Sequence, residues 1–98
     1  MFRRIFGRGR ALDGARRLID QGALLLDVRS EEEFGERHVP GALNIPVQSL
    51  AQRLRELPDK QHPIVVHCRS GMRSATAADL LRKAGWQNVH DIGGFPPW

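Results

Sequence analysis

Short apolar runs alternate with stretches of helical periodicity along this chain, and this alternation limits the fold more than any other feature. Two continuous apolar runs, residues 23–26 and 64–66, are typical of strands that are buried on both faces of a parallel sheet. Around them, apolar residues recur at every third or fourth position, as they do on one face of a helix. Strands that alternate with helices predict the α/β class, with a mostly parallel sheet and helices on both faces.

Local signals set the boundaries of the predicted strands and of the first two helices. Ser30 and Glu33 have the spacing of a capping box, so a short helix is expected to begin there. An earlier stretch of helical spacing is expected to end near Gly22. Four strands are expected, at residues 23–26, 43–45, 64–67 and 89–92.

Two more helices are predicted in the second half of the chain. Leu50, Leu54 and Leu57 share one helical face and predict a single amphipathic helix that stops at Pro58. The last helix carries apolar residues at helical spacing and is expected to end at Gly85.

Length and composition describe one globular domain. The chain has 98 residues, which suits a single compact core. Its hydrophobic share of 41% and charged share of 27% are those of a folded protein rather than a disordered one. A single cysteine excludes an internal disulfide and a zinc site made of cysteine pairs, and no metal or organic cofactor is expected. No apolar run approaches the length that spans a bilayer, so no membrane span is expected.

Positive charge is concentrated at the N-terminus. The net charge is +4, but the first 17 residues hold six arginines and one aspartate, so the remainder is nearly neutral. We therefore expect a basic N-terminal arm over residues 1–10, solvated and mobile, ahead of a domain over residues 11–98. Weak contact of the arm with phosphates or anionic lipid is the alternative, and no nucleic-acid partner is expected.

The first residues also resemble the start of an export signal. Arg3 and Arg4 form a pair like that of a twin-arginine signal, but glycine and arginine alternate over residues 7–10, where such a signal needs a long apolar stretch. We expect a cytoplasmic protein, or a periplasmic one if an upstream signal has been removed.

The segment after the third predicted strand carries the strongest functional signal. Cys68 stands where that strand ends, shortly before a helix begins. Backbone N–H groups of such a loop and of the first helical turn converge on one point and form an anion-binding nest. Gly71 lets the backbone bend inward, and Arg69 and Arg73 add positive charge. Because these groups favour a thiolate, we predict a pKa for Cys68 below its ordinary value of about 8.5.

A lone cysteine is more often an inert core residue, and only its setting between a strand and a helix favours a reactive thiol here. His67 directly precedes Cys68 in the strand, so its side chain is expected to point to the opposite face. We interpret His67 as structural.

Five segments of the chain together resemble the successive signatures of the rhodanese family. They are residues 25–29, 32–34, 38–46, 68–74 and 93–98. The resemblance covers nearly the whole chain and implies a single five-stranded α/β domain in which Cys68 becomes a persulfide. Four strands are evident, and a fifth would fall at residues 2–6. Arg37 departs from the family, which often has glycine at this position.

The resemblance implies a sulfurtransferase that moves a sulfane sulfur from thiosulfate, or a related small anionic donor, to cyanide or to a thiol, including a protein thiol. Cys68 would be the nucleophile, and the substrate would be bound by Arg69, Ser70, Gly71, Met72, Arg73 and Ser74. The six residues from Cys68 to Arg73 match the loop of sulfurtransferases, whereas phosphatases and arsenate reductases of this fold are known for a loop one residue longer. The alternative function is a rhodanese-like sulfur carrier or protein-interaction module with little turnover of its own.

Other residues are expected to support the loop. Asp27 would orient the backbone near it, and Arg29 would pair with an acid such as Glu33. Gly93 and Gly94 would let the chain pass close to the loop.

Overall fold

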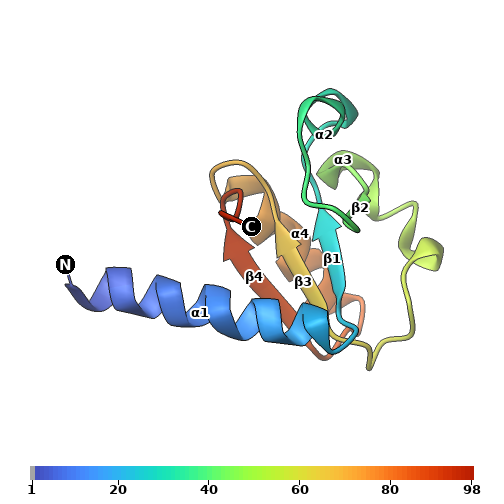
Figure 1. The fold of residues 1–98 in the computed structure, drawn as a ribbon. Coiled ribbons are helices and arrows are strands. Elements are labelled where there is room, and N and C mark those ends of the chain that lie inside the picture. The colour runs from blue at the N-terminus through green and yellow to red at the C-terminus, as the bar shows by residue number, and fades with distance from the viewer. Residues whose placement is uncertain (1) are drawn as a thin grey trace.

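Helices and strands alternate along the chain, as the sequence predicts (Figure 1). The computed structural model describes residues 2–98, with side chains from Gly9 onward. The elements in chain order are α1 (Phe2–Asp20), β1 (Leu24–Asp27), α2 (Glu31–Glu36), β2 (Leu43–Asn44), α3 (Val47–Leu50), the 3₁₀ helix η1 (Leu54–Glu56), β3 (Ile64–His67), α4 (Met72–Lys83) and β4 (Val89–Gly93).

The strands form one parallel sheet in the order β2-β1-β3-β4. Asp27 of β1 is paired with His67 of β3, and His67 is paired with Gly93 of β4, so the carboxyl ends of the three longer strands lie in a row. Ligands of open parallel sheets bind at this edge. The fifth strand considered at residues 2–6 is wrong, because α1 covers residues 2–20; the part of the predicted basic arm that the structure describes is helical.

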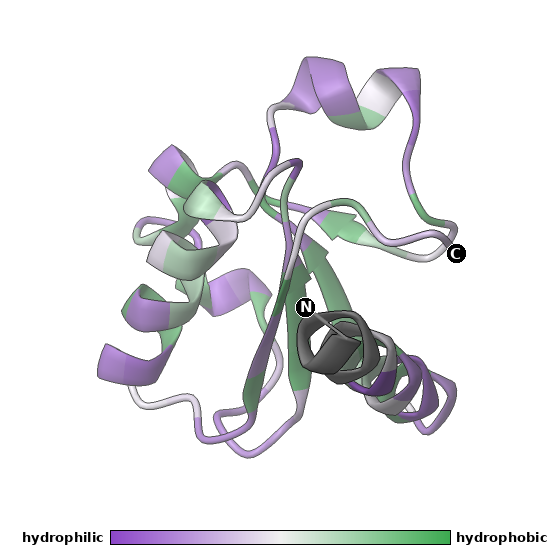
Figure 2. Ribbon diagram, turned by 90° about the vertical axis from the view of Figure 1, so that its left-hand side faces the viewer, coloured by the Kyte–Doolittle hydropathy of each residue, from purple (hydrophilic) through white to green (hydrophobic). Residues whose placement is uncertain are grey.

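The sheet is buried between two layers of helices because alternate side chains of each strand point to opposite faces. Leu25 and Val65 face α1, where they pack with Ala15 and Ile92. Leu26 and Val66 face the other layer, formed by α3, η1 and α4, and pack with Leu50, Leu57, Ala77 and Leu81. Figures 1 and 2 show α1 on one side of the sheet and α4 on the other, with the hydrophobic strands between them. The prediction of an α/β domain with helices on both faces is confirmed.

The single amphipathic helix predicted across Leu50, Leu54 and Leu57 is wrong. The helix α3 ends at Leu50, and η1 begins at Leu54 after a turn in which Arg53 has φ −119° and ψ 19°. All three leucines still pack on the core, with Leu50 0% exposed and Leu57 9% exposed. The apolar spacing therefore identified the buried face correctly, although the backbone between these residues leaves the helical conformation.

Candidate functional site

The loop that carries Cys68 begins where β3 ends and runs into the first turn of α4; we call residues 68–73 the cysteine loop. The N–H of Cys68 donates to the Gly93 carbonyl at 2.8 Å, which continues the pairing of β3 with β4. Gly71 then takes φ +109°, a left-handed conformation that side-chain-bearing residues rarely adopt, and α4 begins at the next residue. The backbone thereby turns back over the cysteine side chain.

The thiol of Cys68 is surrounded by hydrogen-bond donors. The Gly71 N–H donates to Sγ at 3.0 Å. Burial raises the pKa of Cys68, but hydrogen bonds from the Ser74 hydroxyl and from the N–H groups of Ser74, Gly71 and Ser70 lower it, and the net pKa lies below its ordinary value. The Ser74 hydroxyl donates to the Gly71 carbonyl at 3.1 Å and can rotate toward a thiolate. The predicted direction of the pKa shift is confirmed.

Cys68 is 0% exposed, and its side chain also contacts the core cluster under α4. The loop and the first turn of α4 also donate hydrogen bonds to the sulfur. The thiol therefore contacts both hydrocarbon and backbone N–H groups, which is a different setting from an inert core cysteine.

The rate at which Cys68 is alkylated is expected to follow a lowered pKa. Only the thiolate reacts with iodoacetamide, so the rate should rise with pH to a plateau whose midpoint lies below about 8.5. The same protein unfolded in urea is the control, because there the midpoint returns to that of a free cysteine. A native midpoint at or above the unfolded one would contradict the hydrogen-bond arrangement of the loop.

The segment after β4 lies directly against the cysteine loop. Ser70 and Gly94 form an isolated antiparallel bridge, and the Phe95 N–H donates to the Arg69 carbonyl at 3.3 Å. A Cβ at Gly94 would lie 2.8 Å from the Arg69 carbonyl oxygen, closer than real Cβ atoms approach. The expectation that the chain passes close to the loop at this point is confirmed.

Gly94→Ala is expected to displace the cysteine loop and to destabilise the fold by about 1–3 kcal/mol, because the clash is with backbone that cannot move independently. Gly35→Ala in α2 is the matched control, since a Cβ there meets nothing within 4 Å and should change stability by no more than about 1 kcal/mol. Urea unfolding measures both. Equal effects of the two substitutions would contradict the close approach.

The guanidinium of Arg73 is paired with Glu33 of α2 through two hydrogen bonds, of 2.6 and 3.0 Å. The hydrogen bond from Arg73, with one from the Ser30 N–H, lowers the pKa of Glu33 to about 2. Glu33 also completes the predicted capping box with Ser30. One carboxylate thus fixes the start of α2 and ties α2 to the cysteine loop.

Arg29 pairs with an acid, as predicted, but the acid is Asp27 and not Glu33, which was given as the example. Its Nε lies 3.0 and 3.1 Å from the two carboxylate oxygens of Asp27, and its Nη2 lies at 2.7 Å. Both side chains are buried, at 6% and 0% exposure, so the arginine pairs with the acid that is buried beside it. Asp27 Oδ1 also accepts from the Arg29 N–H at 3.0 Å, so Asp27 orients the backbone that follows β1.

His67 lies on the α1 face of the sheet, opposite Cys68, as predicted. Its Nδ1 is 3.1 Å from the Cys68 carbonyl, and its ring meets the Phe95 ring edge-on. Nε2 is buried with no hydrogen-bond partner, 3.6 Å from Asp27 Oδ2. Burial lowers the pKa of His67, so the neutral ring is the favoured form.

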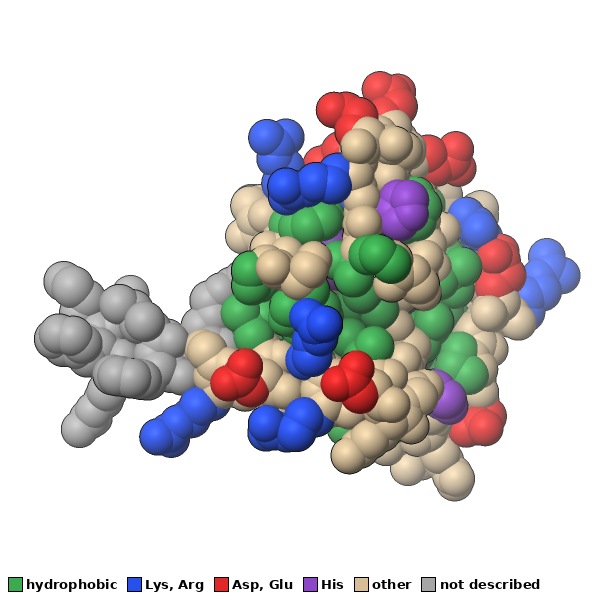
Figure 3. All heavy atoms as spheres, viewed as in Figure 1, with side chains coloured by type: hydrophobic (Ala, Val, Ile, Leu, Met, Phe, Trp, Pro, Cys, Tyr) green, Lys and Arg blue, Asp and Glu red, His purple; other side chains and the backbone are tan. Residues whose placement is uncertain are grey.

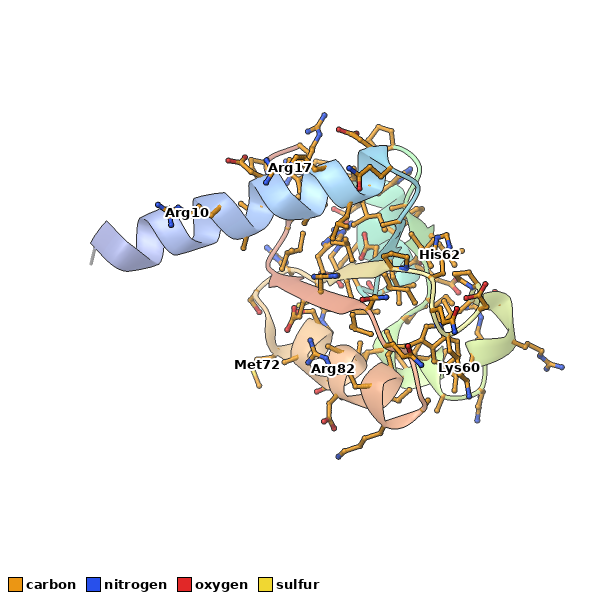
Figure 4. All side chains as sticks on the ribbon, turned by 90° about the horizontal axis from the view of Figure 1, so that it is seen from below. Arg10, Arg17, Lys60, His62, Met72 and Arg82 are labelled. Atoms are coloured by element: carbon orange, nitrogen blue, oxygen red, sulfur yellow. The ribbon has the colours of Figure 1, made fainter. Side chains whose placement is uncertain are left out.

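The remaining predicted site residues form an exposed rim. Arg69, Ser70 and Met72 are exposed, and Met72 is the only large hydrophobic side chain described as exposed, at 80% (Figure 4). Residues 9–98 contain no group of three or more potential metal ligands. Within residues 2–98, no helix has the length and apolar character to cross a membrane.

Two polar residues at this edge were not predicted from the sequence. Asn44 donates to the carbonyls of Asp27 and Arg29, both at 2.9 Å, and so links β2 to the strand end beside it. Arg37 had been noted only as a departure from the family, but it lines a cavity with Arg69. A polar residue inside a short apolar strand was the available signal for Asn44.

Comparisons with known proteins agree with this geometry. A family model described as Rhodanese-like domain matches residues 11–98. The uncharacterized protein YqhL of Bacillus subtilis is 40% identical over 77 residues, which cover 78% of this chain and 60% of YqhL. Thiosulfate sulfurtransferase GlpE of Haemophilus influenzae is 39% identical over 82 residues, which cover 83% of this chain and 77% of GlpE. The structure of the human single-domain sulfurtransferase TSTD1 has a TM-score of 0.75 and 33% identity, covering 87% of this chain and 88% of that one.

The fold and the site define a class of α/β domains with a parallel sheet and a cysteine in the loop after a central strand, where the segment after the last strand contacts that loop. Within that class, the chain belongs to the rhodanese-like domain family.

Proposed function

We propose that the protein is a sulfurtransferase that moves a sulfane sulfur from thiosulfate, or a related donor, to cyanide or a thiol through a persulfide on Cys68. The observation that carries the proposal is the ring of donors around Sγ, which favours a thiolate at the end of β3. The sequence identity of 39% with the Haemophilus influenzae protein named thiosulfate sulfurtransferase GlpE supports the same chemistry.

The reaction has two balanced steps through a covalent intermediate. The Cys68 thiolate attacks the outer sulfur of thiosulfate, the sulfur–sulfur bond of the donor breaks, and its electron pair leaves with sulfite. The resulting persulfide anion is stabilised by the N–H groups of the loop. Cyanide or a thiolate then attacks the outer sulfur of the persulfide, and the thiolate of Cys68 leaves. These steps require no metal or organic cofactor.

The other loop residues have positioning and binding roles in this proposal. The N–H groups of Ser70, Gly71 and Ser74 hydrogen-bond the sulfur, and Gly71 supplies the turn that brings the loop over it. Arg69 is exposed and free of ion pairs among the described side chains, so it is available to the anionic donor. Arg73 forms an ion pair with Glu33, so its main role is to fix the position of the loop. Its positive charge also interacts favourably with a Cys68 thiolate. A loop of this length suits a single sulfur better than a tetrahedral phosphate, which disfavours phosphatase activity.

A sulfur carrier that serves a protein partner is the second candidate function. The observation that favours it is Met72, which is 80% exposed at the rim of the loop. Methionine is a common contact residue of adaptable protein-binding surfaces. A carrier would use the same persulfide but would show poor turnover with small acceptors.

The test is formation of thiocyanate from thiosulfate and cyanide by the purified full chain, compared with sulfur transfer to protein thiols. A stand-alone sulfurtransferase turns over with cyanide, whereas a carrier transfers sulfur faster to a protein thiol. If sulfur is transferred neither to cyanide nor to a protein thiol, the proposal is contradicted.

A further inference from the structure

A cavity of about 220 Å³ lies between α2, the cysteine loop and the segment after β4. Its position at the carboxyl edge of the sheet places it beside the candidate site, because Arg69 follows Cys68 directly in the chain. Figure 3 shows acidic and basic side chains gathered at this end of the molecule, over α2. The lining side chains are Arg29, Glu33, Glu36, Arg37, Arg69 and Phe95.

Two of the charges in this lining are already compensated. Arg29 is bound to Asp27, and Glu33 is bound to Arg73. The other three charged residues, Glu36, Arg37 and Arg69, are exposed, and none of them has an ion-pair partner among residues 9–98. The uncompensated charge of the cavity is therefore positive, with two guanidinium groups against one carboxylate.

Arg37 is held in place next to the loop by contacts that leave its guanidinium N–H groups free. Its carbonyl accepts from Arg29 Nη2 at 2.7 Å. Its guanidinium carbon lies 4.3 Å from the centroid of the Phe95 ring. Phe95 in turn donates its N–H to the Arg69 carbonyl. Because a cation over an aromatic face keeps its edge available for hydrogen bonds, Arg37 has free donors beside the cavity that Arg69 also lines.

We propose that this cavity binds the charged oxygen atoms of a small anionic sulfur donor, and that Arg37, together with Arg69, sets a preference for dianions. The inference rests on the proposed sulfurtransferase function. In this arrangement the sulfonate end of thiosulfate lies among Arg37, Arg69 and the Phe95 ring, while Glu36 opposes anion binding. Arg37 is a specificity-determining residue that does not touch the reacting sulfur.

The first test measures anion binding without any sulfur chemistry. Sulfate, which cannot react with Cys68, is titrated into the isotopically labelled full chain, and the amide shifts of Arg69, Gly71 and Phe95 are followed by NMR. Arg37→Gln removes the charge but keeps the stem, and is expected to weaken sulfate binding about three- to tenfold. Glu36→Gln is expected to tighten it by at least about twofold. Arg17→Gln, at an exposed arginine of α1, which lies at the opposite end of the molecule from α2 (Figure 1), is the matched control and should change binding by less than about twofold.

The proposal is overturned if the wild-type chain shows no saturable sulfate shifts at these amides, or if Arg37→Gln has no larger effect than Arg17→Gln. Thermal unfolding of each variant checks that the fold is kept, which is expected because Arg37 contributes its carbonyl, not its side chain, to the bond with Arg29.

The second test separates donor specificity from the transfer chemistry. Arg37→Gln should raise the KM for thiosulfate, a dianion, about three- to tenfold with little change in kcat, and should raise the KM for methanethiosulfonate, a monoanion, by a smaller factor. An equal rise for both donors would overturn the preference for dianions. If the wild-type chain transfers no sulfur while sulfate binding still responds to Arg37 and Glu36, the proposed function fails and the anion site stands.

Discussion

Cys68→Ser is expected to reduce thiocyanate formation from thiosulfate and cyanide by at least about a thousandfold. The serine hydroxyl is not ionised at neutral pH, so the donors around position 68 have no anion to stabilise, and no persulfide can form on oxygen. The rate is measured with the purified full chain under saturating thiosulfate.

Two controls make this result interpretable. Residue 68 is 0% exposed and part of the core, so the substitution could disturb the fold. Cooperative thermal unfolding of Cys68→Ser shows that the fold is kept. Arg17→Gln, on the exposed face of α1, should keep the wild-type rate. A folded Cys68→Ser protein that still produces thiocyanate would mean that sulfur transfer does not proceed through this thiol.

Asp27→Ala is expected to lower the free energy of unfolding by about 3–5 kcal/mol, because it leaves the Arg29 guanidinium buried without its counterion. In a domain of this size, that loss corresponds to a fall in Tm of more than about 12 °C. The exposed pair of Arg53 and Glu56 is the comparison, and Glu56→Ala should lower the free energy of unfolding much less than Asp27→Ala does.

A double variant distinguishes loss of the ion pair from loss of packing. Replacing Asp27 by leucine together with Arg29 by methionine removes both charges and keeps most of the volume, so it should be more stable than Asp27→Ala. A double variant that is less stable than Asp27→Ala would contradict the view that an uncompensated charge causes the effect.

Local patterns in the sequence were sufficient for much of the fold. The capping box of Ser30 and Glu33 depends on residues three positions apart, and the structure has both of its hydrogen bonds. The buried strands could be predicted from the continuous apolar runs, because a strand whose side chains are apolar on both faces must be covered by helices on both sides. The leucines of α3 and η1 show the limit, because spacing reports which side chains are buried and not whether the backbone between them stays helical.

The lowered pKa of Cys68 was also predictable, because the donors come from residues within six positions of the sulfur. The partners of the arginines were not. Arg29 lies between two acids in the sequence, Asp27 and Glu33, whereas Glu33 is 40 positions from Arg73. Only the packing of α2 against the cysteine loop decides that Glu33 binds Arg73 while Asp27 binds Arg29. The cavity beside the loop combines α2, the loop and Phe95, which are far apart in the sequence, so no local pattern could indicate it.

The most direct test of a persulfide on Cys68 is the intact mass of the full chain after exposure to thiosulfate and removal of excess reagent. We expect a gain equal to one sulfur atom, its loss on addition of cyanide, and no gain in Cys68→Ser. An unchanged mass of the wild-type chain, or an equal gain in the serine variant, would contradict the claim that the loop holds a persulfide on Cys68.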